Sequence, residues 1–228
     1  MAEDADRWSA EIQRLKDLAP ELWEATLQTL YMVAMSTFFS LVLGFFLAVV
    51  MISAHPHGLR PRPKLYQVLD VLVNLVRSFP FIILLVAIIP FTRMVVGTSI
   101  GSTAAVVPLV IAATPFAARL IEGSFLEVDS GVIEAARSFG ASNGQIIFRV
   151  LLPEALPAIV LNIAVLAIVL LGYSAMAGVV GGGGLGDLAI KYGYNRFQSD
   201  MMLYSVFILV VIVQFIQTYT NARYKKLR

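Results

Sequence analysis

The stretch Glu134-Ala135-Ala136, followed by Gly140 and then by Val150-x-Leu152-Pro153, decides how the rest of this chain is interpreted. It lies in a polar segment between two strongly apolar segments. A chain in a bilayer has few structural reasons to keep a turn of small residues, a glycine and a Leu-Pro stop together in one short loop. We therefore predict that another protein docks on this segment.

The first part of the segment predicts a helix that ends at a glycine. Ile133 and Ala136 share one helical face, because residues three apart adjoin on a helix. Glu134 and Arg137 share a neighbouring face. The small alanines keep the helix surface low, so that a partner can approach closely. Gly140 can adopt a positive φ and end the helix.

The second part predicts another helix. Ser142-x-x-Gln145 resembles a capping box, which marks a helix N-terminus, and this helix is expected to run to about Leu152. Pro153 and Pro157 are expected to bend the chain into the next apolar segment. The alternative is an ordinary loop that is rich in good helix formers.

Composition places the chain among integral membrane proteins. Of its 228 residues, 58% are hydrophobic and 14% are charged, whereas soluble domains carry about 25% charged residues. There is no cysteine, which excludes disulfides and thiol chemistry. The net charge of +2 gives no support to a nucleic-acid partner. We predict an all-α membrane protein.

Five segments are apolar and long enough to cross a bilayer, which takes about 20 residues of helix. They are Leu27–Ile52, Leu65–Pro90, Ile100–Ile121, Pro157–Val180 and Met201–Tyr219. An odd number of spans puts the two termini on opposite sides of the membrane.

Lysine and arginine then set the orientation, because cytoplasmic loops carry an excess of them. One set of loops holds ten: Arg60, Arg62, Lys64, Arg119, Arg137, Arg149, Arg223, Lys225, Lys226 and Arg228. The opposite set holds six: Arg7, Arg14, Lys16, Arg93, Lys191 and Arg196. We predict that the N-terminus lies outside and that the segment containing Glu134 lies in the cytoplasm, as does the C-terminus.

These observations divide the chain into three parts. Residues 1–24 form an external tail, residues 25–220 form the transmembrane domain with its polar loop at about 122–156, and residues 221–228 form a basic cytoplasmic tail. In the first part, apolar side chains recur at helical spacing: Trp8, Ile12, Leu15, Ala19 and Leu22. The tail is either an amphipathic helix on the outer membrane surface or a solvated leader.

The spacing from Glu134 to Pro153 resembles the EAA loop of ABC-importer permeases, with Val150 in place of an isoleucine. Further stretches between about Leu65 and Tyr194 resemble the permease subunit of methionine importers. They are Ser78-Phe79-Pro80-Phe81-Ile82-Ile83, Pro90-Phe91-Thr92-Arg93, Val96-Gly97-Thr98-Ser99-Ile100-Gly101 and Gly172-Tyr173-Ser174-Ala175-Met176.

The resemblance implies a multi-pass permease in the bacterial cytoplasmic (inner) membrane that imports methionine. Its implied partners are a second copy of itself, a pair of ABC ATPase subunits and an external substrate-binding protein. ATP and magnesium would be bound by the ATPase, so no cofactor is expected in this chain. The loop helix would be the coupling helix, formed by Ile133, Glu134, Ala135, Ala136, Arg137 and Gly140.

Polar groups at membrane depth are candidates for function. Asn162 and Tyr173 are close to three turns apart in the fourth span and can face one side, with Ser174 about 100° further round. We predict a substrate path past these residues and Met176. The alternative is that they make interhelical hydrogen bonds and packing contacts. Arg77 is interpreted as structural, near the cytoplasmic end of its span.

Two motifs are rejected. Gly181–Gly186 fits G-x-G-x-x-G, but a dinucleotide site needs a strand before it and a helix after it. We expect a flexible or tightly turned outer loop instead. It is not a P-loop, because Asp187-Leu188 stands where lysine and serine or threonine are required. His55-Pro56-His57 supplies too few ligands for a metal site. No catalytic or metal-binding residue is therefore expected.

Other functions remain open. The same machine could carry another small amino acid or solute. A secondary transporter would need ion-coupling carboxylates, and Asp70 is the clear carboxylate within the apolar segments. A membrane scaffold without transport is the third alternative. Because the spans offer no obvious charged cage, we expect solute selection to lie mainly in the external binding protein.

Overall fold

The computed structural model describes residues 2–227, with side chains described at residue 13 and from residue 16 onward. Regular structure in this part of the chain is entirely helical, so the predicted all-α class is confirmed. The helices are α1 (Ala2–Ala54), α2 (Pro63–Ser78), α3 (Phe81–Ala87), α4 (Ile89–Val96), α5 (Ser102–Leu126), α6 (Ser130–Ser138), α7 (Asn143–Ile146), η1 (Ile147–Leu151), α8 (Leu152–Ala177), η2 (Gly178–Gly182), α9 (Gly184–Leu188), η3 (Ala189–Tyr194) and α10 (Ser199–Leu227), where η marks a π-helical turn.

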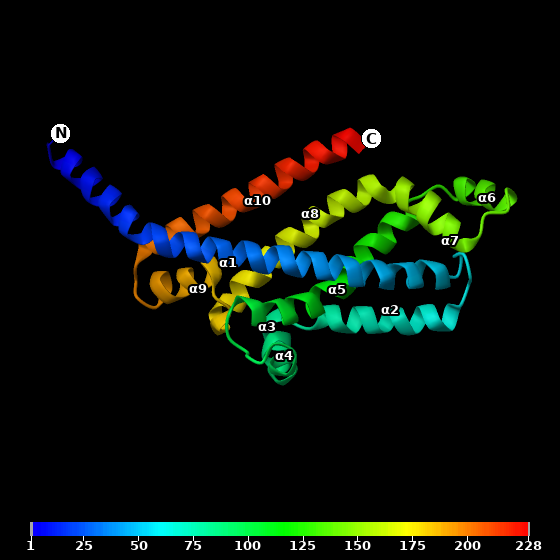
Figure 1. The fold of residues 1–228 in the computed structure, drawn as a ribbon, viewed down its shortest axis with the longest axis horizontal. Coiled ribbons are helices and arrows are strands. Elements are labelled where there is room, and N and C mark those ends of the chain that lie inside the picture. The colour runs from blue at the N-terminus through cyan, green and yellow to red at the C-terminus, as the bar shows by residue number, and fades with distance from the viewer. Residues whose placement is uncertain (1, 228) are drawn as a thin grey trace.

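Four helical stretches are long and apolar enough to cross a bilayer by themselves. They are Lys16–Ala54, Ser102–Leu126, Asn143–Gly182 and Ser199–Leu227. The shortest has 25 residues, which is about 37 Å of helix, against a hydrocarbon core of about 30 Å. A fifth crossing is possible if α2 and α3 together make one broken span. Figure 1 shows α1, α2, α5, α8 and α10 running along the long axis of the molecule.

The second predicted span is not one helix. The chain bends by 97° between α2 and α3. Phe79 adopts an extended conformation (φ −73°, ψ 128°), as expected for a residue that precedes proline. Pro80 then begins α3 with its fixed φ. The predicted span over about Leu65–Pro90 is therefore not one continuous helix, and the Pro80 ring is the physical reason for the break.

The fourth span begins earlier than expected. Helical conformation continues from Asn143 through α7, η1 and α8 into η2, where the backbone leaves helical angles at Val180 and Gly181. Pro153 has no N–H, and its ring would collide with a carbonyl of a regular preceding turn. The π-helical turn just before it, in which the Leu152 N–H donates to the Ile147 carbonyl, widens the helix there. The predicted end near Leu152 is wrong, although the ribbon does change direction between α7 and α8 (Figure 1).

The predicted N-terminal tail continues into the first span. α1 has no break at residue 24, and Pro20 lies within it. Of the predicted apolar stripe, Trp8, Ile12 and Leu15 lie outside the described side chains, Ala19 is exposed and Leu22 is buried. Leu22 packs in a cluster with residues of α9 and α10. The membrane-surface role of residues 1–24 stays a prediction.

α1 packs most extensively against α5. A β-carbon added at Gly44 would lie 2.7 Å from the β-carbon of Ala117 and 3.0 Å from the backbone nitrogen of Ala118. Small residues at such crossings let two membrane helices approach closely. α10 packs on α8 from another side. Apolar side chains of α2 and α3 remain exposed in the described chain, among them Val68, Leu72, Leu75 and Ile83.

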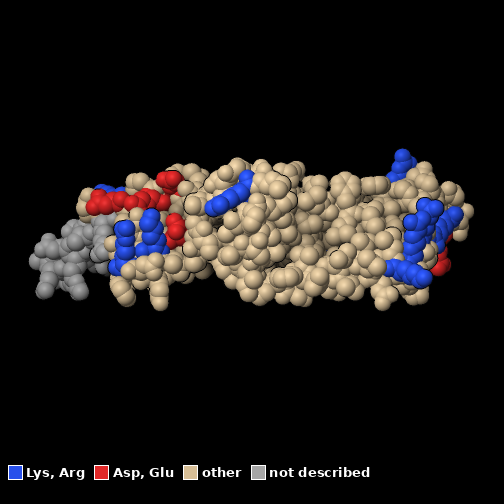
Figure 2. Space-filling model, turned by 90° about the horizontal axis from the view of Figure 1, so that it is seen from below, with Lys and Arg blue, Asp and Glu red and all other residues tan. Residues whose placement is uncertain are grey.

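Charged side chains gather at the two ends of the molecule, and the middle of the face in Figure 2 carries almost none. α6, α7 and the loop between α1 and α2 lie at one end, whereas α9 and the N-terminal part of α1 lie at the other (Figure 1). On this face a largely uncharged belt therefore separates two polar ends, as expected of a membrane protein.

Candidate functional site

The polar segment singled out in the sequence folds as two capped helices. The Asp129 carboxylate accepts a hydrogen bond of 2.6 Å from the Gly131 N–H at the start of α6. Gly140 has a φ of 79°, and the Ala141 N–H donates to the Ala136 carbonyl at 3.1 Å, which ends the helix as helices ending on a left-handed glycine do. The predicted break at Gly140 is confirmed.

The second helix of the segment begins as predicted. The Gln145 N–H donates to the Ser142 hydroxyl, and the Ser142 N–H donates to the Gln145 side-chain oxygen. This reciprocal pair is the capping box. The break between Gly140 and Ser142 is thus held by its own hydrogen bonds.

One face of α6 holds it to the rest of the protein. Ile133 and Ala136 are half-buried and pack on a core that includes Ile147 and Leu151. The Arg137 guanidinium donates a 3.4 Å hydrogen bond to the Gly58 carbonyl, in the loop between α1 and α2. A cavity of about 350 Å³ separates that loop from α6. The attachment is light for a helix of nine residues.

The opposite face of α6 is free for a partner within the described chain. Glu134 and Ala135 are exposed. Phe139 follows the helix and is 91% exposed. The sequence analysis missed Phe139, although a large aromatic between a polar helix and a glycine was the available signal. Of the two alanines, only Ala135 lies on the exposed surface.

The two histidines lie beside this end of the molecule. The His57 N–H donates to His55 Nδ1 at 3.2 Å, and the His55 ring meets Tyr66 edge to face. Among the side chains that the structure describes, no group of three histidine, cysteine or acidic residues is placed to hold a metal.

The predicted substrate-path residues are not brought together. Asn162 donates to the Leu120 carbonyl at 3.2 Å and to the Ser124 hydroxyl at 2.9 Å, which ties α8 to α5. Ser174 is buried and donates to the Leu171 carbonyl within its own helix. Met176 lies apart and is 47% exposed. The geometry gives Asn162 and Ser174 the packing roles that were the alternative.

Tyr173 does line a cavity. Its ring stacks on Phe81 with a centroid distance of 4.5 Å and an interplanar angle of 1°. The cavity holds about 250 Å³ and is lined by Val76, Arg77, Phe79, Phe81, Ala112, Phe116, Val169 and Tyr173. Arg77 lies in the last turn of α2, at the end far from the loop between α1 and α2. The prediction that Arg77 lies near the cytoplasmic end of its span does not fit this position, because the predicted cytoplasmic end is the one at the loop between α1 and α2.

A second arginine lies on the neighbouring helix and is fully paired. Arg119 of α5 contacts Asp70 of α2 and donates a 2.8 Å hydrogen bond to Glu122. Glu122 is 2% exposed, so this ion pair is among the most buried polar contacts of the chain. It ties α2 to α5. Arg119 is thus part of a span rather than of the polar loop.

The glycine-rich segment closes the other end of the molecule. The Gly184 N–H donates to the Gln28 side chain at 2.8 Å, and the Leu185 N–H donates to the Thr29 hydroxyl at 2.9 Å. A β-carbon at Gly186 would lie 2.4 Å from the α-carbon of Ala175. The tightly turned loop is the correct alternative of the two that the sequence left open.

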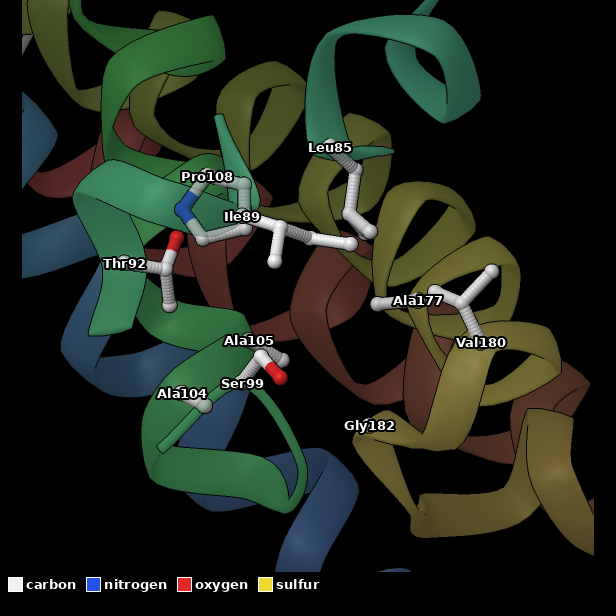
Figure 3. A pocket seen from close by; sticks show the side chains of 10 residues that line it. All are labelled: Leu85, Ile89, Thr92, Ser99, Ala104, Ala105, Pro108, Ala177, Val180 and Gly182. Carbon is white, nitrogen blue, oxygen red and sulfur yellow. The ribbon is translucent and has the colours of Figure 1, made fainter. Parts of the chain in front are cut away.

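Packing at this end leaves little room. The space where α4, α5 and η2 meet holds about 10 Å³, which is about one water molecule. Figure 3 shows Thr92, Ser99, Val180 and their neighbours crowding around it. A solute does not fit into this space in this conformation.

Comparisons with known proteins agree on one family. Residues 40–226 match the family described as "binding-protein-dependent transport system inner membrane component". The chain is 51% identical over 201 residues to the probable D-methionine transport system permease protein MetI of Vibrio cholerae, covering 88% of this chain and 89% of that one. It is 43% identical over 197 residues to the methionine import system permease protein MetP of Bacillus subtilis, covering 86% and 89%.

A solved structure has the same fold. An inward-facing crystal form of the MetNI methionine ABC transporter superposes with a TM-score of 0.91 and 42% sequence identity. The match covers 93% of this chain and 98% of that one.

Proposed function

The chain belongs to the family of binding-protein-dependent transport system inner membrane components, and from that premise we propose that it is the membrane-spanning permease subunit of an ATP-driven methionine importer. Relatives of similar length carry methionine in their names. Two copies of the chain would enclose the translocation path, and an external binding protein would deliver the solute.

One observation carries the coupling role. α6 is capped at both ends, projects from one end of the molecule and presents Phe139 at 91% exposure. Exposed aromatics that enter a partner's pocket are the residues that dominate protein interfaces. The partner proposed here is the ATPase subunit, which binds ATP and magnesium and pushes on α6 when it closes.

The orientation follows from charge. Arg119 lies within α5 and pairs with Asp70, so it leaves the loop count, and nine of the original ten lysines and arginines remain at one side against six at the other. The excess still supports a cytoplasmic location for α6 and the C-terminus. The N-terminus and the glycine-rich closure then lie outside.

Reconstitution tests this function. The chain is co-expressed with its ATPase, purified and placed in vesicles with ATP and the binding protein. We expect uptake of labelled methionine, and an ATPase variant that binds but does not hydrolyse ATP should abolish it. Uptake driven by an ion gradient without ATP would favour a secondary transporter. ATP-driven uptake of another solute alone would replace methionine, and failure to copurify with any ATPase would contradict the coupling role.

A further inference from the structure

Arg77 is a cation at membrane depth without an acidic partner in the described chain. It lies about 20 Å along α2 from Pro63, at about 1.5 Å per residue. Its guanidinium lies 5.7 Å from the centroid of the Phe116 ring. No aspartate or glutamate side chain of the described residues forms a salt bridge with it, whereas Arg119 has two. A charge at this depth is costly unless something pairs with it.

The surroundings of Arg77 form a small aromatic chamber. Phe81, Phe116 and Tyr173 line it together with Phe79. The parallel stack of Tyr173 on Phe81 fixes two of these rings across the junction of α3 and α8. Its volume of about 250 Å³ is a little below the roughly 300–1,000 Å³ typical of pockets for drug-sized ligands. An amino acid is a ligand of the right size.

The backbone gives an independent reason to expect water or solute here. The chain leaves helical conformation at Phe79 and Pro80, beside the chamber. Non-helical backbone at membrane depth is tolerated only where it is buried in protein or lines an aqueous cavity. Phe79 is half exposed within the chain. The lining residues of the chamber come from α2, α3, α5, α8 and the bend between α2 and α3.

We infer that this chamber is a solute site within the permease, in which Arg77 binds the carboxylate of the translocating amino acid. A guanidinium binds a carboxylate through two parallel hydrogen bonds. The thioether side chain of methionine contacts the rings of Phe81 and Phe116, since sulfur packs favourably against aromatic edges. One face of the Tyr173 ring stacks on Phe81, and we assign its other face to the ammonium group. This inference rests on the proposed function and replaces the expectation that the path has no charged group for the solute.

Such a site should bind weakly. A transport site must be favourable enough to enter and weak enough to leave. We expect millimolar binding of methionine to the purified permease–ATPase complex without the binding protein. Methioninol, which carries a hydroxyl in place of the carboxylate, should bind about tenfold more weakly, because it cannot accept the charge-assisted hydrogen bonds that a carboxylate takes from a guanidinium.

The decisive variant is Arg77→Gln. It should abolish the preference for methionine over methioninol, and Arg77→Lys should restore part of it. Binding is measured by ligand-detected NMR on the complex in nanodiscs, and uptake by the wild type with its binding protein is measured in parallel. Absence of methionine uptake by the wild type with its binding protein would contradict methionine import itself. Wild-type uptake together with equal binding of methionine and methioninol, or no binding at all, would overturn the site while leaving the importer intact.

A second variant keeps the inference testable if Arg77→Gln does not assemble. Val169→Trp would fill the chamber from α8, and we expect it to remove methionine binding and reduce uptake at least tenfold. Ile168→Trp is the matched control, since the neighbouring residue lines the separate groove between α8 and α10. Equal binding in both tryptophan variants would also overturn the inference.

Discussion

The two ends of the molecule are built in opposite ways. At one end, α6 is held by Ile133, Ala136 and a single long hydrogen bond from Arg137, and its outer face is open. At the other end, Gly184 and Gly186 pack closely on α1 and α8, where an added β-carbon would lie 2.7 Å from the Thr29 hydroxyl oxygen and 2.4 Å from the α-carbon of Ala175. A lightly held helix suits a part that another protein must move. Closely packed backbone suits a part of the protein that must pack tightly without bulky side chains.

The largest effect we expect tests which end faces which compartment. The chain has no cysteine, so single cysteines report accessibility without background. Ser142→Cys, beside α6, should escape an impermeant thiol reagent in intact cells, whereas Ser199→Cys, beside the glycine-rich end, should react. Both should react once the cells are opened. Labelling of Ser142→Cys alone in intact cells would show that the two ends face the opposite compartments from those proposed.

The next effect tests the closed end. Gly186→Val places a side chain where the first added carbon already lies 2.4 Å from the α-carbon of Ala175. We expect a loss of stability of about 3 kcal/mol, at the upper end of the usual cost of overpacking, measured as denaturation in detergent. Gly172→Ala is the control, because a β-carbon there meets nothing within 4 Å. Equal stability of the two variants would show that the glycine-rich end is loosely packed.

A smaller effect is expected at the open end. Phe139→Ala should weaken ATPase binding by about 2 kcal/mol, the size typical of an interface hot spot, and reduce stimulated ATP hydrolysis. Its own stability should hardly change, because the side chain is 91% exposed. Phe207→Ala, an exposed phenylalanine of α10, provides the control. Full ATPase binding by the Phe139 variant would place the docking surface elsewhere.

The smallest effect concerns the tie between α6 and the loop before α2. Arg137→Gln removes the 3.4 Å hydrogen bond to the Gly58 carbonyl. Because both groups are exposed, we expect less than about 1 kcal/mol of lost stability. Hydrogen exchange of α6 amides should nevertheless quicken relative to those of α5. Unchanged exchange would mean that the packing of Ile133 and Ala136 alone holds the helix.

Local rules predicted the local features well. The glycine at position 140 and the pair Ser142 and Gln145 act through their own backbone within a few residues, so their geometry follows from sequence spacing. The long apolar segments likewise predicted the spans, because a bilayer accepts little else than a helix of that length.

Features that depend on the neighbours of a helix were harder to predict. The bend at Phe79–Pro80 lies within a run of apolar residues, so the hydropathy pattern does not reveal it, although the proline stands in the sequence. Asn162 was assigned to a substrate path because its acceptors, Leu120 and Ser124, lie some 40 residues away. Arg77 meets Phe116 and Tyr173 only in the folded chain, so sequence spacing alone could not place it beside them. Long-range packing, rather than propensity, decides such roles.

The helix that follows the capping box has a mechanical consequence. α8 has 26 residues, which measure about 39 Å along the axis. It is joined to α7 through the π-helical turn η1 and to the glycine-rich segment through η2. The chain changes direction before α8, between α7 and α8 (Figure 1), and leaves helical backbone angles after it, at Val180 and Gly181. Because a hydrogen-bonded helix is stiff along its length, a tilt applied beside α6 reaches the glycine-rich segment through a rigid rod with a joint at each end.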